Sequence, residues 1–268
     1  MRTSSLLKSH RGRARFPLAL TTVAILMPAV VTAGPAEQGS NPAGGQRTVN
    51  KPAVDQKKPA ATQENSKPKP VKRRLITVNG GTFSLDIRQW PLIGKPDAKY
   101  VFVEMFDYTC PYCRATHQAV RGAIEHFGDD LAIIALPVPL DAACNRTVTS
   151  TAPEHADACE IARIAVAVWR VNRAKFAEFH SWVFDPNHRP SAAETLQHAG
   201  ELVGDKAIQD ELNKPTAAAD ITRHVELYER VGSGSLPKII FTASTVSGSV
   251  DSASTLIDMI NQNGLAPQ

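Results

Sequence analysis

The chain has 268 residues, of which 43% are hydrophobic, and a formal net charge of +4. The positive charge is concentrated at one end: residues 1–74 hold 14 Lys and Arg against 3 Asp and Glu, whereas residues 75–268 hold 16 against 23. The larger part of the chain therefore carries a net charge of −7, and the basic total does not indicate nucleic-acid binding. We expect no nucleic acid among its partners.

The N-terminus has the features of an export signal. Residues 1–15 contain five Lys and Arg and no acid, residues 16–36 are uncharged, and Val31-Thr32-Ala33 offers the small residues that a signal peptidase requires. We expect a signal peptide over residues 1–33, or an N-terminal anchor in which residues 16–33 form a membrane tether. Export would place the protein in the periplasm, the cell envelope or the extracellular space, where disulfides persist.

Residues 34–73 are rich in proline, lysine and alanine and contain almost no large apolar side chains. Such a segment cannot bury enough apolar surface to fold, so we expect a disordered linker. A solvated spacer is the simplest role for it, and contact with anionic membrane headgroups is the alternative. The folded domain is then expected to span residues 74–268.

The first half of this domain is predicted to alternate strands and a helix. Two short strands flank Asn79-Gly80-Gly81, a strong turn signal, and predict a hairpin. An apolar run then predicts a buried strand, helical spacing of apolar residues predicts a helix that ends at Gly128, and a second apolar run follows. The predicted ranges are 75–78 and 82–85 for the hairpin, 100–106 for the first buried strand and 131–138 for the second.

The most informative motif is Cys110-Pro111-Tyr112-Cys113, which stands where the first buried strand passes into the helix. Two cysteines at this spacing can form a small disulfide ring that opens and closes readily. Cys110 would lie at the helix N-terminus, where free N–H groups and the helix dipole favour a thiolate, so it is the expected nucleophile. Cys113 lies one turn further in and is the expected resolving cysteine. The motif predicts redox chemistry.

The motif has two other interpretations. A zinc site would need two more ligands at short spacing, but Cys144 and Cys159 are not paired in that way, and we expect no metal. A purely structural bridge between Cys110 and Cys113 would close too small a loop to stabilise the fold appreciably.

The second half is predicted to contain a helical insertion over about residues 140–231, followed by two strands and a closing helix. Thr151-Ala152-Pro153-Glu154 matches a capping box, and apolar residues recur at helical spacing behind it. The remaining predicted elements are helices at 175–184, 192–203 and 217–230, strands at 238–241 and 247–250, and a helix at 252–263. A central sheet flanked by helices, and hence the α/β class, follows.

These residues resemble the thioredoxin superfamily, and more narrowly its DsbA-like thiol-disulfide oxidoreductases. Glu104 stands six residues before Cys110, where family members bury an acid, and Ser235-Leu236-Pro237 precedes an apolar run, where they have a cis-proline. The resemblance implies a thioredoxin-like fold with a helical insertion between the active-site half and the cis-proline half. It also implies that Glu104 relays the proton of Cys113 and that Pro237 is the cis-proline.

The same resemblance implies that Leu236, Pro111 and Tyr112 contact the substrate. The Pro111-Tyr112 pair departs from the Pro-His of the best-known DsbA proteins and is found in many glutaredoxins, so the direction of catalysis stays open. Residues 137–169 also resemble thioredoxin-like domains that are associated with vitamin K epoxide reductase-type membrane proteins. A membrane redox partner is therefore expected.

Cys144 and Cys159 are expected to bond to each other in an oxidising compartment. A bridge that closes a loop of this size is worth roughly 3 kcal/mol in the chain-entropy model, which favours a structural disulfide. A second redox pair that exchanges with Cys110 is the alternative.

Other polar and aromatic residues give weaker indications. His117 follows Cys113 by one turn, and a solvent-facing position on the helix is the favoured interpretation over one that faces the site. Asp107 and Tyr108 border the motif and could shape substrate access. The aromatic residues of the insertion are expected to pack it against the core, and they are Phe176, Phe179, Trp182 and Phe184.

The sequence thus predicts an exported thiol-disulfide oxidoreductase that forms or exchanges disulfides in cysteine-containing polypeptides and needs no cofactor. A reductase or isomerase of the same fold is one alternative. A non-catalytic protein that holds copper or a client through its thiols is the other.

Overall fold

The computed structural model describes residues 73–264, all of which belong to one compact unit. The predicted signal peptide, and all but the last residue of the predicted linker, lie outside the described residues. Within the part described, no helix combines the length and the apolar character that a membrane crossing requires.

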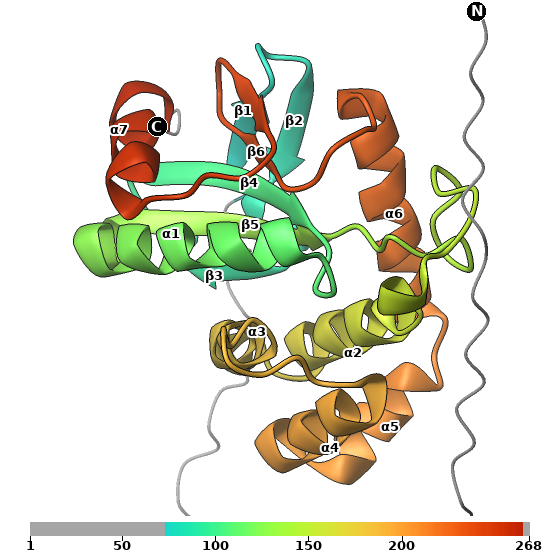
Figure 1. The fold of residues 1–268 in the computed structure, drawn as a ribbon. Coiled ribbons are helices and arrows are strands. Elements are labelled where there is room, and N and C mark those ends of the chain that lie inside the picture. The colour runs from blue at the N-terminus through green and yellow to red at the C-terminus, as the bar shows by residue number, and fades with distance from the viewer. Residues whose placement is uncertain (1–72, 265–268) are drawn as a thin grey trace, which may run out of the picture. The chain divides into compact units, whose positions relative to one another are not determined.

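A five-stranded sheet forms the centre of the unit, with the strand order β3-β5-β4-β6-β7 (Figure 1). The central pair, β4 (Tyr100–Phe106) and β5 (Leu131–Pro137), is parallel and almost wholly buried. Burial on both faces explains why the two strands are apolar throughout, apart from Glu104 in β4. The other neighbours are antiparallel, and they are β3 (Leu92–Gly94), β6 (Lys238–Ile240) and β7 (Thr245–Ser247).

The predicted hairpin forms a separate two-stranded sheet from β1 (Leu75–Val78) and β2 (Phe83–Asp86). Its turn contains Asn79 and two glycines at positive φ, a backbone region that glycine enters at little cost. The N–H of Asn79 donates to the carbonyl of Phe241 at 2.9 Å, which attaches the hairpin to the chain just beyond β6.

Two helices pack against each other beside the sheet (Figure 1). Helix α1 (Pro111–Phe127) runs alongside β4 and β5, and α7 (Ala253–Asn263) lies against it. The contact is close at Gly122, where an added Cβ would stand 2.5 Å from that of Ala253. Helix α1 ends at Gly128, as predicted.

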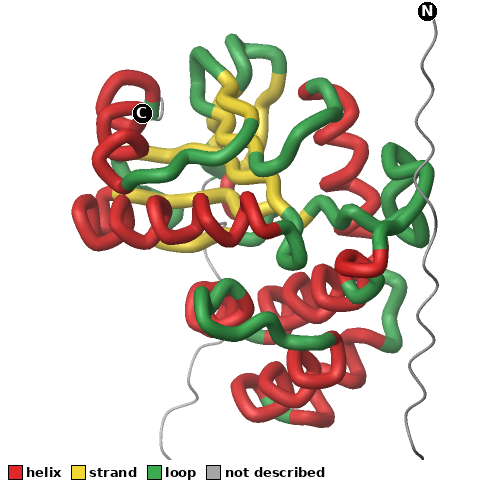
Figure 2. The backbone as a smooth tube through the Cα atoms, viewed as in Figure 1, coloured by secondary structure: helices red, strands yellow, loops and turns green. Residues whose placement is uncertain are grey.

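Five helices stand between β5 and β6, and Figure 2 shows most of them as a helical group beside the sheet. Helix α2 packs against each of the other four. Their bounds are α2 (Ala158–Val171), α3 (Phe176–Val183), α4 (Ala192–Val203), α5 (Asp205–Leu212) and α6 (Thr216–Val231). The α/β class and the helical insertion between the half that carries the cysteine motif and the half that carries Pro237 are confirmed.

Several local predictions were wrong. The capping box at Thr151 is absent, because the Thr151 hydroxyl donates to Asp141 and accepts from the N–H of Ala142. Residues 153–155 form a short 3-10 helix instead, and α2 begins only at Ala158. The insertion has a capping box instead at Ser191, the N-cap of α4.

The last strand was also misplaced, since β7 ends at Ser247 rather than beginning there. Strand β3 and helix α5 were missed. Strand β3 is only three residues long, and α5 has charged residues at four of its eight positions, so neither carries a clear apolar period.

Candidate active site

The two cysteines of the motif lie at the junction of β4 and α1. Strand β4 ends at Phe106, the N–H of Cys110 donates to the carbonyl of Asp107 at 3.2 Å, and the chain then enters α1 with Cys110 as N-cap and Pro111 as first residue. Proline is tolerated there because that position has no N–H partner within the helix. Both cysteines are free thiols, with Cys113 fully buried and Cys110 4% exposed.

The two thiols differ in acidity. The pKa of Cys110 is lowered from 9.0 to about 7, first because the Cys113 thiol donates to it and then because the N–H groups of Cys113 and Tyr112 do so; burial and the charge of Asp107 oppose this. The pKa of Cys113 is raised, chiefly by burial and then by its neighbour Cys110. Near neutral pH Cys110 is therefore partly thiolate, and Cys113 keeps its proton.

Glu104 lies in the middle of β4, between Ala135 of β5 and Ile239 of β6. Its side chain is completely buried, and neither carboxyl oxygen has a hydrogen-bond partner within residues 73–264. Burial raises its pKa from 4.5 to about 8. With this pKa, both the protonated and the ionised form of Glu104 are populated near neutral pH. A group that transfers protons needs both forms.

Leu236 and Pro237 are joined by a cis peptide bond immediately before β6. Because β6 is antiparallel to β4 and Lys238 pairs with Met105, the start of β6 lies beside the end of β4 that leads to Cys110. The fold thus brings Pro237 to the same edge of the sheet as the thiols. Leu236 is buried, whereas Pro111 and Tyr112 are exposed, Tyr112 at 65%.

Asp107 is buried beside the motif and holds the turn in place. One carboxyl oxygen accepts the N–H and the hydroxyl of Thr109, and the other accepts the N–H of Leu140 at 2.7 Å. The Thr109 hydroxyl also contacts Nδ1 of His155 at 2.7 Å. No role for Asp107 could be predicted from the sequence, because Leu140 and His155, which complete this hydrogen-bond network, are distant along the chain.

The expectation that His117 faces solvent was wrong. His117 is 1% exposed and stacks on Phe184 with ring centroids 4.8 Å apart, because the end of α3 covers this face of α1. Burial lowers its pKa to about 4. Its neighbour His180 is also buried and contacts the hydroxyl of Tyr108 through Nδ1 at 3.0 Å, so both rings are neutral at physiological pH.

Two further residues near the thiols were missed. Tyr228 accepts the N–H of Gly234 at 2.8 Å, and its pKa is raised by burial first and also by the charge of Cys113, which places it near that thiol. Arg114 is buried behind the motif, where it donates to the carbonyls of Tyr108, Val183, Asp185 and His188. Nothing in the spacing along the chain distinguishes them.

A disulfide joins Cys144, in the loop after β5, to Cys159 in the first turn of α2, with an S–S distance of 2.06 Å and Cα atoms 6.0 Å apart. Hydrogen bonds brace this loop: Asp141 accepts from Thr151 at 2.8 Å, and Asn145 donates to Pro139 at 2.6 Å. Over residues 73–264, no group of three or more His, Cys, Asp or Glu is placed to hold a metal ion.

Comparisons with curated proteins give short matches. The chain is 43% identical over 54 residues to the Na(+)/H(+) antiporter NhaA 1 of Mycobacterium sp. (strain KMS), which is 20% of this chain and 9% of the antiporter. It is 31% identical over 111 residues to NhaA 1 of Mycolicibacterium gilvum, which is 41% of this chain and 16% of that protein. The chain thus spans less than a fifth of the length of these relatives.

Solved structures match over more of the chain. A thioredoxin-like oxidoreductase from Silicibacter pomeroyi is similar with a TM-score of 0.52 at 23% identity, covering 64% of this chain and 90% of that one. BdbD from Bacillus subtilis has a TM-score of 0.52 at 18% identity, with 70% and 97% covered. The thiol-disulfide exchange protein alpha-DsbA2 from Wolbachia pipientis has a TM-score of 0.51 at 17% identity, with 65% and 87% covered. At these identities the likeness establishes the fold.

The family assignment comes from a different comparison. The thioredoxin family model matches residues 88–259, a range that begins before β3, contains both cysteines of the motif and Pro237, and covers more than half of the chain. The chain therefore belongs to the thioredoxin family, and its fold is that of the DsbA-like members.

Proposed function

We propose that the protein is an exported thiol-disulfide oxidoreductase that acts on cysteine-containing polypeptides through Cys110 and Cys113. The observation that carries this proposal is the inequality of the two thiols at the start of α1, one with a pKa near 7 and the other buried and protonated. This is the asymmetry that separates an attacking sulfur from a resolving one.

The reaction exchanges sulfur–sulfur bonds in two steps. The Cys110 thiolate attacks a substrate disulfide, forms a bond to one substrate sulfur and releases the other as a thiolate. Cys113 then loses its proton and attacks Cys110, which releases the first substrate sulfur and leaves a Cys110–Cys113 disulfide. The substrate gains two electrons and the protein loses two. The reverse sequence donates a disulfide to a substrate dithiol.

Glu104 is proposed to exchange the proton of Cys113 in the second step. Its burial and its unpartnered carboxyl group support this role. A buried carboxylate without hydrogen-bond partners is unstable, so it readily accepts a proton from a neighbouring thiol. Pro237 and Leu236, at the same edge of the sheet, are proposed to align the bound peptide, and the exposed Pro111 and Tyr112 to contact it.

Export and partners are parts of the same proposal. The features of residues 1–33 and the disulfide between Cys144 and Cys159 support an oxidising compartment such as the periplasm. Residues 34–73 would then be a linker between the export signal and the catalytic domain. Turnover in either direction also requires a membrane redox partner that resets Cys110 and Cys113.

The acidity of Cys110 supports a second candidate direction of catalysis, in which the protein reduces or isomerises substrate disulfides. Strongly oxidising members of this superfamily have a nucleophile with a pKa of about 3.5, and reducing ones have a pKa of about 7. The Cys110 pKa of about 7 therefore favours reduction or isomerisation as the second candidate function. The equilibrium potential of the pair in a glutathione buffer separates the two, since a strongly negative value marks a reductase and one near −120 mV a disulfide donor.

Two variants test the proposal. Cys110→Ser should abolish insulin reduction and the oxidation of a dithiol peptide, because no attacking sulfur remains. Cys113→Ser should accumulate mixed disulfides with clients, because the first step proceeds and the second does not. Full activity of Cys110→Ser in both assays would refute the proposed function.

A further inference from the structure

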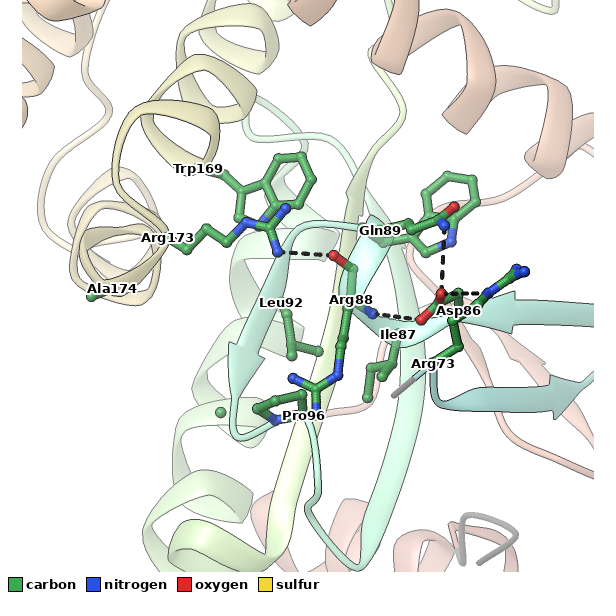
Figure 3. Close-up of a pocket in the computed structure, with 12 residues that line it drawn as sticks. Arg73, Asp86, Ile87, Arg88, Gln89, Leu92, Pro96, Trp169, Arg173 and Ala174 are labelled. Carbon is green, nitrogen blue, oxygen red and sulfur yellow. Dashed lines mark hydrogen bonds and ion pairs between the residues drawn. The ribbon is translucent and has the colours of Figure 1, made fainter. Parts of the chain in front are cut away.

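A cavity with a volume of about 660 Å³ has no lining residue from the thiol motif (Figure 3). It lies between the segment that runs from the end of β2 through the 3-10 helix Ile87–Gln89 to β3, and the last turn of α2 with the segment that follows it. This volume is in the range of small-molecule sites.

One set of lining residues is apolar or aromatic. Trp90 and Trp169 contribute two largely buried indole rings, and Ile87 is completely buried beside them. Leu92 and Pro96 are half-buried. These side chains offer a surface for an apolar group of a ligand.

The other set is cationic and consists of Arg73, Arg88 and Arg173. The one acid in the lining is Asp86, and its carboxyl group already accepts from Arg73 at 3.1 Å, from the N–H of Arg88 at 3.3 Å and from Gln89 at 3.4 Å. Asp86 is therefore occupied, and the cavity keeps an excess of positive charge.

Arg88 is the residue that points to a ligand. Its side chain runs across the cavity toward Pro96 (Figure 3), and its guanidinium has no hydrogen-bond or ion-pair partner anywhere in residues 73–264. The Nε atom is buried as well as unpartnered, a costly arrangement for a charged donor. Two oxygens of one anionic group would satisfy Nε and a terminal nitrogen side by side.

Arg173 gives this site a second cation. Its guanidinium donates to the carbonyl of Arg88 at 2.9 Å and lies over the Trp169 ring, 4.7 Å from the centroid. The remaining nitrogens stay free to approach an anion that is held by Arg88. Other arginines of this acidic domain pair with acids: Arg170 pairs with Asp220 at 2.7 Å, and Arg163 with Glu160 at 2.6 Å.

We propose that this cavity is a binding site for an organic anion that has an apolar body, such as an alkyl or aryl carboxylate. The carboxylate lies against Arg88, with Arg173 beside it, and the apolar body lies against Trp90 and Trp169. The site is independent of the thiol chemistry, so the two proposals fail separately.

A matched series of eight-carbon compounds tests the site. Octanoate should bind the full chain and change its tryptophan fluorescence, because two of the three tryptophans line the cavity. Octylamine, which has the same chain and the opposite charge, and acetate, which lacks the chain, should bind at least tenfold more weakly by calorimetry. Equal affinity for octanoate and octylamine would overturn the proposal, as would no binding of octanoate.

Variants locate the site. Arg88→Gln, which removes the guanidinium and its charge and leaves a shorter polar side chain, should weaken octanoate binding about tenfold or more, as expected for the loss of a two-point ionic contact. Arg121→Gln, which removes an exposed arginine on α1, should bind octanoate as the parent does. Cys110→Ser should also bind normally. Unchanged octanoate affinity in Arg88→Gln, with an unchanged melting temperature, would contradict the assignment.

Discussion

The two cysteine pairs of this domain both place a cysteine at the start of a helix, yet their surroundings are opposite. Cys110 is the N-cap of α1 and Cys159 is the second residue of α2, so the helix dipole alone does not separate them. Cys159 is bonded to a loop that its own hydrogen bonds brace. Cys110 lies beside the free thiol of Cys113, and the preceding strand, β4, contains the buried carboxyl group of Glu104, which has no hydrogen-bond partner among residues 73–264.

The difference shows where stability and reactivity lie. Around the closed pair, polar groups are satisfied, and the bridge connects two segments that are 15 residues apart. Around the open pair, burial shifts the pKa of Glu104 and Cys113 upward, while thiol and N–H donors shift that of Cys110 downward. Unsatisfied buried groups cost stability and make proton and thiol chemistry possible.

The largest predicted effect concerns the closed pair. Replacing both Cys144 and Cys159 with serine should lower the free energy of unfolding by about 3 kcal/mol, because the unfolded chain regains the entropy that the bridge removes. Urea denaturation measures this loss. The rate of thiol exchange below the unfolding transition should stay within about twofold of the parent, since neither residue meets the substrate. Loss of exchange by a folded double variant would instead make the second pair part of the redox cycle.

The next effect concerns the buried carboxyl group. Glu104 titrates near 8 in the folded protein and near 4.5 in the unfolded chain, so the unfolded state binds fewer protons between these values and stability falls as pH rises through this window. Glu104→Gln, which cannot ionise, should therefore be more stable than the parent by about 3 kcal/mol at pH 7 and equally stable at pH 4. Denaturation at the two pH values measures the difference.

The same variant should slow the second exchange step, because the proton of Cys113 has lost its acceptor. A gain in stability that is equal at pH 4 and pH 7 would show that ionisation of Glu104 is not the cause.

A smaller effect tests why Cys110 is acidic. The rate of its alkylation by iodoacetamide should rise with pH and level off above a midpoint near 7, as the thiolate forms. Cys113→Ala removes the thiol donor that lowers the pKa most, and should move the midpoint up toward 9.0. Cys113→Ser keeps a donor and should move it less. A midpoint that stays near 7 in Cys113→Ala would exclude the Cys113 thiol as the cause.

The smallest effect concerns the charge of Asp107, which raises the pKa of both thiols. Asp107→Asn should lower the alkylation midpoint of Cys110, by less than Cys113→Ala raises it. Asp130→Asn removes an exposed charge beyond the other end of α1 and is the matched control, for which no shift is expected. A midpoint that rises in Asp107→Asn would show that the hydrogen bonds of this side chain outweigh its charge.

The sequence predicted the parts of this molecule that depend on local chemistry. The buried strands β4 and β5 follow from apolar runs, which only Glu104 interrupts, and the boundaries of α1 follow from Pro111 and Gly128. The motif itself indicated the unequal thiols. The likeness to a known family, rather than any periodicity, singled out Glu104 and Pro237.

The parts that escaped prediction depend on contacts between distant segments. His117 is buried only because α3 packs over α1, and the role of Asp107 depends on Leu140 and His155, which belong to the insertion. The capping box predicted at Thr151 does not form, because the Thr151 hydroxyl bonds to Asp141 and Ala142 of a neighbouring loop. Local patterns cannot report these competing partners.

The central claim is that Cys110 and Cys113 form the redox pair, while Cys144 and Cys159 form a bridge that stays closed. Mild reduction of the oxidised protein, followed by alkylation and peptide mass spectrometry, tests it most directly. The account predicts that Cys110 and Cys113 are labelled together while the bridge between Cys144 and Cys159 remains intact. Labelling of Cys144 and Cys159 before, or together with, Cys110 and Cys113 would contradict it.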